Sequence, residues 1–133
     1  MDFEYIKVIK SDLDDIDEAV SFVLEKLSSV IRDEELMFNI RIVINEIVIN
    51  SYEHGNKCNK EKGINLKVCV NMDCIHINVK DEGDGINYIF NENRDINTTT
   101  SGRGLRIVKH LVDELEINNN EITAKIKCEG NDT

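Results

Sequence analysis

The sequence predicts an α/β two-layer sandwich in which a mixed, mostly antiparallel sheet carries its helices on one face. Segments with the two-residue alternation of strands and segments with the period of helices follow one another along the 133 residues. Their order is a strand, two helices, a hairpin, a loop, a helix and a second hairpin, which favours helices layered on one side of a sheet. No proline, internal repeat or low-complexity tract marks a boundary, so we expect one domain over residues 1–133.

The first part of the chain is predicted to form one strand and two helices. "FEYIKVI", residues 3–9, alternates weakly and indicates the first strand. Ser11 or Asp12 is suited to cap the helix that follows, in which apolar residues recur at helical spacing. A second helix is expected over residues 33–54, and Gly55 after it is suited to the left-handed conformation that glycine adopts at helix C-termini.

The rest of the chain is predicted to contain two hairpins and a third helix. "GINLKVCV" and "CIHINVK" alternate on either side of "NMD", and "LEI" and "EITAKIKC" flank "NNN". "GRGLRIVKHLVDEL" indicates a helix, and its predicted buried side consists of Leu105, Val108, Leu111 and Val112. The polar segment 81–101 has little periodicity, and a loop of that length inside a compact domain is usually functional or mobile.

Charge and composition exclude several classes of function. Lys+Arg 16 against Asp+Glu 26 gives a formal net charge of −10, which disfavours direct binding to nucleic acid or an anionic membrane and suits a partner with a basic surface. The N-terminus has no signal-peptide pattern, and no segment is long and apolar enough to span a bilayer. The four cysteines form no CxxC pair and have no His at metal-ligand spacing. We therefore expect a cytoplasmic protein with buried reduced thiols and no membrane contact.

The helical segment "NEIVINSYEHG" carries polar residues among its isoleucines and valines. Glu46 and Asn50 are four residues apart, so they lie one turn apart on the same face of the predicted helix. A carboxylate and a carboxamide in this arrangement can hold a hydrated Mg²⁺ and position an attacking hydroxyl or water. Taken alone, the pattern is also what an amphipathic helix shows on its solvent-exposed side.

Two glycine-bearing motifs follow. Asp81 ends a predicted strand and precedes Gly83 and Gly85, so it offers a fixed acceptor for an exocyclic amine, such as adenine N6, beside backbone that a ligand can approach closely. "TSGRGLRIV" puts Gly102 and Gly104 at the start of a predicted helix, where free N–H groups suit a phosphate. Taken alone, the first motif is also typical of a glycine-rich turn and the second of a Ser-capped helix.

In this order, over residues 42–113, the motifs resemble those of the GHKL (HATPase_c) ATP-binding domains of gyrase, histidine kinases and MutL, which have the Bergerat fold. "NEIVINSYEHG" and the chain length are similar to those of the anti-sigma-factor serine/threonine kinases, the RsbW/SpoIIAB-like group. The resemblance covers most of the chain. It implies ATP and Mg²⁺ as ligands, a homodimer, and a sigma factor and an anti-anti-sigma protein as partners.

The resemblance also implies roles for single residues. Glu46 matches the acidic residue thought to act as catalytic base, Asn50 the residue that binds Mg²⁺, and Asp81 the aspartate that binds adenine. The further nucleotide-binding positions that it implies are Gly83, Gly85, Ser101, Gly102, Arg103, Gly104, Leu105 and Thr123.

The sequence departs from the family pattern at two places. Thr100 stands where a basic residue often precedes the Ser-Gly of the third motif. Arg103 offers a phosphate contact in its place, although a solvated surface arginine is the favoured interpretation. The glycine usually found before the residue matched by Thr123 is absent. These departures bear on the efficiency of phosphoryl transfer more than on nucleotide binding.

Three hypotheses of function follow. The leading one is an ATP-dependent protein serine/threonine kinase that acts as an anti-sigma factor, binding ATP–Mg and phosphorylating an anti-anti-sigma antagonist. The departures at Thr100 and Thr123 motivate a non-catalytic, nucleotide-gated regulatory binding protein. A detached histidine-kinase-type ATPase domain is disfavoured, because too few residues precede the first motif to supply a dimerisation hairpin with its own phosphoacceptor His.

Overall fold

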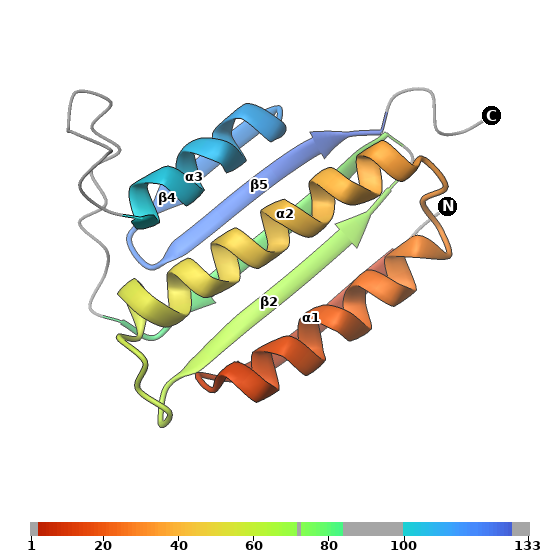
Figure 1. The fold of residues 1–133 in the computed structure, drawn as a ribbon. Helices are drawn as coiled ribbons and strands as arrows, with labels where there is room; N and C mark the ends of the chain where they lie inside the picture. The colour runs from red at the N-terminus through yellow and green to blue at the C-terminus, as the bar shows by residue number, and fades with distance from the viewer. Residues whose placement is uncertain (1–2, 72, 84–99, 129–133) are drawn as a thin grey trace.

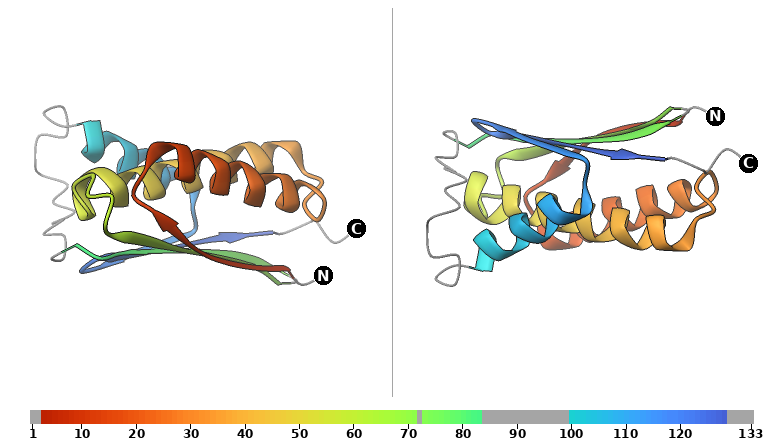
Figure 2. Two further views of the ribbon diagram at one scale, coloured as in Figure 1. Left: turned by 90° about the horizontal axis from the view of Figure 1, so that it is seen from below. Right: turned by 90° about the horizontal axis from the view of Figure 1, so that it is seen from above.

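In a computed structural model, a five-stranded sheet is covered on one face by helices, as the two edge-on views of Figure 2 show. The structure describes residues 3–71, 73–83 and 100–128, with only the backbone of 100–103. The strand order in the sheet is β1-β2-β3-β5-β4 (Figure 1). The strands are β1 (Phe3–Lys10), β2 (Gly63–Val70), β3 (Cys74–Asp81), β4 (Glu114–Asn118) and β5 (Glu121–Lys127).

The predicted fold class is confirmed, with one correction to the sheet. All four pairings between the described strands are antiparallel, so this sheet is not mixed. The physical reason lies in the connection between β1 and β2. Two helices cross the sheet between these strands, and they return the chain to the end of the sheet at which β1 finished. The next strand therefore runs antiparallel to β1.

Aspartates cap the first two helices. Asp12 caps α1 (Leu13–Ser28), because its side chain accepts from the Asp14 N–H at 2.9 Å. The alternative cap, Ser11, is buried and accepts a hydrogen bond from Asn56 instead. Helix α2 (Glu34–Asn50) is capped in the same way by Asp33, whose side chain accepts from two backbone N–H groups. Each cap satisfies donors that a helix N-terminus otherwise leaves unpaired.

The end of the second helix differs from the prediction. Helix α2 continues into a π-helical turn, η1 (Ser51–Gly55), so the helical stretch reaches the predicted end. Gly55, however, does not have a positive φ. The left-handed residues follow it: Lys57 has φ 52° and Cys58 has φ 60°. The prediction for Gly55 was wrong because the glycine is required there by close packing against Asp81, not by a left-handed backbone.

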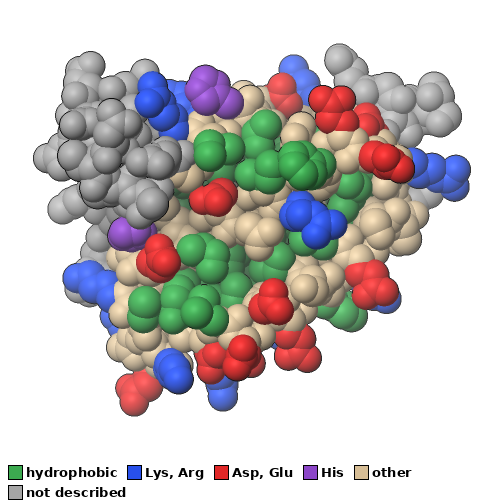
Figure 3. Space-filling view, viewed as in Figure 1, with side chains coloured by type: hydrophobic (Ala, Val, Ile, Leu, Met, Phe, Trp, Pro, Cys, Tyr) green, Lys and Arg blue, Asp and Glu red, His purple; other side chains and the backbone are tan. Residues whose placement is uncertain are grey.

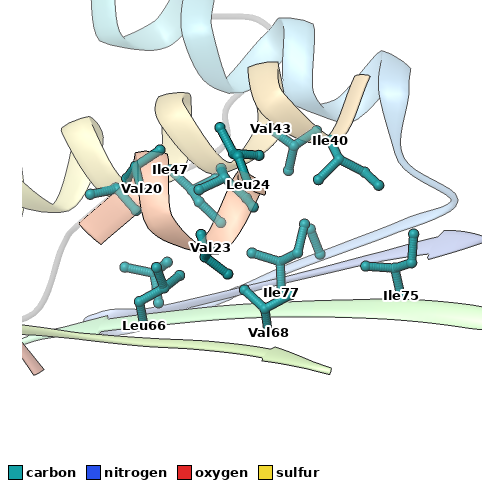
Figure 4. Packing of buried hydrophobic residues seen from close by; sticks show 14 of the residues in the cluster. Val20, Val23, Leu24, Ile40, Val43, Ile47, Leu66, Val68, Ile75 and Ile77 are labelled. Atoms are coloured by element: carbon teal, nitrogen blue, oxygen red, sulfur yellow. The ribbon is translucent and has the colours of Figure 1, made fainter. Parts of the chain in front are cut away.

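The core fills the space between the sheet and the helices (Figure 4). Alternate residues of the central strands point toward the helix layer, as the two-residue period of strands requires. Burying a side chain of this size contributes roughly 1.5–3 kcal/mol each. The buried residues labelled in the close-up are Val20, Val23, Leu24, Ile40, Val43, Ile47, Leu66, Val68, Ile75 and Ile77.

Helix α3 (Thr100–Leu111) packs beside α2 and starts two residues before the prediction. Leu105 and Val108 are buried and Leu111 is half-buried, which confirms these three residues of the predicted inner side. The predicted extension to residue 115 was wrong, because α3 ends at Leu111 and half-buried Val112 lies beyond it, before β4 begins. The closing hairpin turns through two residues between β4 and β5, the first of which, Asn119, has φ 58°.

The structure bears on the cysteines and on membrane spanning. All four cysteines are free thiols. Only Cys128 is buried, while Cys69 and Cys74 are half-buried and Cys58 is exposed, so the expectation of buried thiols holds for one of the four.

Within the described ranges, no helix has the length and apolar character needed to cross a membrane.

Candidate functional site

The predicted site elements come together at one end of the molecule. Figure 1 shows the C-terminal end of α2, the end of β3 and the start of α3 at the same end of the sandwich, and both views in Figure 2 agree. These segments lie far apart in the sequence. The fold therefore assembles the three motifs into one region.

Asn50 ends α2 and lies one turn beyond Glu46. The Asn50 side chain is 4% exposed, and its Oδ1 atom has no hydrogen-bond partner in the described part of the chain. The neighbouring Ser51 hydroxyl is fully buried and likewise unpartnered. Leaving a buried polar atom unpaired costs about 1–3 kcal/mol. Glu46 itself is half-buried, so this corner offers a carboxylate and two unpaired oxygens to a ligand.

Asp81 ends β3 and is 2% exposed. Its Oδ1 atom accepts from the Gly83 N–H at 2.8 Å, and its Oδ2 atom has no partner among the described residues. Burial raises the pKa of Asp81, and the Gly83 hydrogen bond, the charge of Lys62 and the nearby Ser51 hydroxyl partly offset that shift. An unpaired carboxylate oxygen in a dry site is a strong acceptor for an amine donor.

Two glycines allow the close approach between η1 and the end of β3. A Cβ on Gly55 would collide with the carboxylate of Asp81. A Cβ on Gly83 would collide with the carbonyl group of Gly55 and would lie 3.0 Å from Asp81 Oδ1. The Gly83 of the predicted motif thus lies where the sequence placed it, beside the aspartate.

The third motif contacts the first. Gly104 is buried in α3, and a Cβ there would collide with Glu46 Oε1. Leu105 packs into the hydrophobic core. The predicted residues Ser101, Gly102 and Arg103 lie in the first turn of α3, where backbone N–H groups lack intrahelical acceptors; their side chains fall outside the described part. Gly85 also lies outside the described residues.

Thr123 does not join the site. It pairs with Asn78 across β3 and β5, and Asn78 Nδ2 donates to its hydroxyl at 2.9 Å. Directly paired residues share a sheet face, and side chains alternate between faces along a strand. Thr123 therefore lies on the face opposite to Asp81, and the neighbouring Ile122, paired with Val79, occupies the helix side. The Thr123 expectation failed because a one-residue shift along a strand reverses its face.

Sequence reasoning missed two buried polar residues at the site. Ser51 directly follows Asn50 and is fully buried, and Asn56 directly follows Gly55 and is 1% exposed. Their only signal in the sequence is that each stands beside a motif residue. Nothing local distinguishes them from exposed polar residues in a helix end and a loop.

Comparison with known proteins identifies the family. The sequence model described as "Histidine kinase-like ATPase domain" matches residues 9–126. The chain belongs to this family. Among curated relatives, the anti-sigma F factors of Bacillus cytotoxicus (strain DSM 22905 / CIP 110041 / 391-98 / NVH 391-98) and Bacillus thuringiensis (strain Al Hakam) are 30% and 29% identical to it over 92 residues. The aligned part covers 65% of this chain and 63% of each relative, so the chain spans less than two-thirds of their length.

The residues of this histidine kinase-like ATPase domain fit a metal held mainly by its nucleotide. In the described ranges, no group of three His, Cys, Asp or Glu residues is placed to hold a metal ion. Mg²⁺ in nucleotide sites is usually bound through one or two protein oxygens, substrate phosphates and water. The buried, unpaired Asn50 Oδ1 one turn from Glu46 suits that kind of coordination.

Proposed function

We propose that this chain is an ATP-binding anti-sigma regulator that acts as a protein serine/threonine kinase. One observation carries the proposal: three buried oxygens near the motifs, Asn50 Oδ1, Ser51 Oγ and Asp81 Oδ2, have no hydrogen-bond partner among the residues that the structure describes. Native proteins rarely leave buried polar atoms unpaired unless a ligand or water completes them. Membership of the ATPase family supports a nucleotide as that ligand.

Each motif has a role in this proposal. Asp81 accepts a hydrogen bond from the exocyclic amine of adenine through its unpaired oxygen. Asn50 supplies an oxygen ligand for Mg²⁺, which when bound neutralises charge on the transferring phosphates. Glu46 orients or deprotonates the hydroxyl that attacks the γ-phosphate. The N-terminus of α3, including Ser101, Gly102 and Arg103, receives the phosphates on its free N–H groups.

The names of the relatives support the choice of partners. They are anti-sigma F factors, so we propose a sigma factor as the binding partner and an anti-anti-sigma protein as the phosphoacceptor, for a cytoplasmic homodimer. The helix-covered face carries hydrophobic side chains bordered by Asp and Glu (Figure 3). The exposed apolar residues on the helices include Phe22 on α1, Phe38 on α2 and Ile107 on α3. An acidic surface of this kind, on a chain of net charge −10, suits a basic partner.

The test is transfer of the γ-phosphate from ATP, with Mg²⁺, to an anti-anti-sigma protein of the same organism. The wild type should transfer phosphate, and Glu46→Gln should slow transfer by about 10²–10⁴-fold because it removes the base. The glutamine side chain has nearly the same shape as the glutamate side chain, so the dissociation constant of Glu46→Gln for ATP should change by less than about threefold. Transfer by Glu46→Gln at the wild-type rate would rule out Glu46 as the base.

A nucleotide-gated regulator without kinase activity is the second candidate. It is favoured by the departures from the family pattern at Thr100 and Thr123, which bear on phosphoryl transfer more than on nucleotide binding. A regulator of this kind would bind ATP through Asp81, as the proposed kinase would, but it would transfer no phosphate to the antagonist. Sigma-factor binding that changes with ATP in the absence of any phosphotransfer would support it over the kinase.

A further inference from the structure

The side chain of Asn56 joins three separate segments of the chain. Its amide Nδ2 donates to Ser11 Oγ at 2.7 Å and to the Gly63 carbonyl at 2.9 Å. Its Oδ1 accepts from the Glu82 N–H at 2.8 Å. Ser11 precedes α1, Gly63 begins β2, and Glu82 directly follows β3. Both amide hydrogens and the amide oxygen are therefore used, in a residue that is 1% exposed.

The π-helical turn places Asn56 in this position. The Asn56 N–H donates to the Ser51 carbonyl at 2.8 Å, five residues back, where an α-helix would bond four residues back. One extra residue per turn rotates the following side chain by about 100° around the helix axis. The turn thus directs Asn56 toward the segment after β3, which an uninterrupted α-helix would not do.

Asn56 holds one half of the peptide group that links Asp81 to Glu82. The N–H of this peptide group, which belongs to Glu82, donates to Asn56. Its carbonyl, which belongs to Asp81, accepts from Asn120 Nδ2 at 2.5 Å. Two asparagine side chains therefore hold the same peptide plane from opposite sides. A further hydrogen bond holds the same segment, because the Glu82 carboxylate accepts from the Gly63 N–H at 2.5 Å.

We propose that Asn56 is a positioning residue for base recognition: by fixing the Asp81–Glu82 peptide, it sets the direction of the Asp81 carboxylate and with it the selection of adenine over guanine. The inference rests on the proposed nucleotide-binding function. Adenine presents an amine donor where guanine presents a carbonyl acceptor, so a fixed carboxylate oxygen accepts from the first and repels the second. That discrimination depends on the orientation of the carboxylate, since hydrogen bonds weaken steeply with angle.

The test compares Asn56→Ala with Asn56→Asp and Ser11→Ala, using calorimetry with ADP and GDP and unfolding in urea. Asn56→Ala should weaken ADP binding about tenfold or more and reduce the ratio of GDP to ADP dissociation constants. Asn56→Asp keeps an acceptor for the Glu82 N–H but sets a carboxylate oxygen against the Gly63 carbonyl, so it should lower stability while restoring part of that ratio. Ser11→Ala removes one hydrogen bond of Asn56 but leaves Glu82 held, so it should lower stability without changing the ratio.

Equal ADP affinity and an unchanged GDP-to-ADP ratio in Asn56→Ala, with reduced stability, would overturn the inference and leave Asn56 as a purely structural residue. Hydrogen exchange of the nucleotide-free protein separates this failure from failure of the proposed function. In Asn56→Ala, exchange at the Glu82 and Gly83 amides should rise about tenfold relative to Ile77 in the centre of the sheet. If the wild type binds no nucleotide, the proposed function fails. Independently of nucleotide binding, unchanged exchange at the Glu82 and Gly83 amides in Asn56→Ala would overturn the positioning role.

Discussion

The carboxylate of Asp81 lies directly against the α-carbon of Gly55, with no room for a side chain between them. The contact brings the end of η1 against the end of β3, and it places the buried carboxylate beside the helix end that carries Asn50 and Ser51. In the described ranges, three buried oxygens at this end of the molecule, Asn50 Oδ1, Ser51 Oγ and Asp81 Oδ2, have no hydrogen-bond partner. The candidate site therefore depends on a backbone contact as much as on the side chains that face a ligand.

Replacing Gly55 with alanine should displace Asp81. The added methyl group would overlap the carboxylate, and relieving an overlap of this kind costs about 1–3 kcal/mol of stability. Urea unfolding should detect that loss, and calorimetry should detect weaker ADP binding. Gly63→Ala is the comparison for stability alone, because its Cβ would meet only side-chain atoms at close range, Glu82 Oε2 at 3.0 Å and Val8 Cγ1 at 3.2 Å, and the first of these also accepts from the Gly63 N–H. Equal stability of both variants would contradict the assigned contact.

Asp81→Asn should weaken nucleotide binding and stabilise the free protein at neutral pH. Burial raises the pKa of Asp81, so between its ordinary value and the raised value the native state binds more protons than the unfolded state. Wild-type stability therefore falls as pH rises through this window, because a charged carboxylate must stay buried. The neutral amide avoids that cost while losing the acceptor for adenine.

The measurement is urea unfolding of both proteins at pH 7 and at a pH below the ordinary Asp pKa of about 3.9. Asp81→Asn should be the more stable protein at pH 7, and the difference should shrink at the lower pH, where the wild-type carboxyl is also neutral. A difference that stays constant with pH would show that burial of the charge is not its cause.

Gly104→Ala and Glu46→Ala should not be additive. The Cβ added at Gly104 would collide with Glu46 Oε1, the end of a flexible side chain, so the single substitution should cost about 0.5–1.5 kcal/mol, the scale of one side chain pushed off its rotamer. Shortening Glu46 removes the atom that it strikes, and the same substitution in a Glu46→Ala background should cost less by about 0.5 kcal/mol or more. Urea unfolding of the four proteins measures this coupling. Glu46→Gln keeps the colliding atom and should leave the cost unrelieved; additive effects would mean that α3 does not pack on Glu46.

Thr123→Val should leave ATP affinity unchanged. The substitution keeps the side-chain shape and removes only the hydroxyl that accepts from Asn78, on the sheet face away from Asp81. Its cost in stability should be about 1 kcal/mol, the typical net contribution of one hydrogen bond. ATP calorimetry beside Asp81→Asn provides the comparison. A loss of affinity similar to that of Asp81→Asn would return Thr123 to the nucleotide site.

Local sequence patterns determined the elements of this fold. The alternation of "GINLKVCV", the choice of Ser11 or Asp12 as the first helix cap and the apolar spacing of α3 act over a few residues, so they could be recognised without the fold. The order of these elements predicted the layers, and the order of the three motifs indicated the ATPase family that the comparison then identified. The elements that carry the three motifs, α2 with η1, the end of β3 and the start of α3, meet at one end of the molecule, and the roles of Glu46, Asn50 and Asp81 there stay predictions.

Only the tertiary structure decided how the site is held. The face of Thr123 depends on which residue of β3 it opposes, and the reason for Gly55 is a carboxylate that arrives from another strand. The hydrogen bond from Glu82 to Asn56 spans 26 residues of sequence. Strand register and contacts of this range are set by the packing of whole elements, because the energy of each contact exists only once distant segments meet. The sequence alone therefore determined which segments form and which motifs they carry, whereas packing decided which atoms they leave for a ligand.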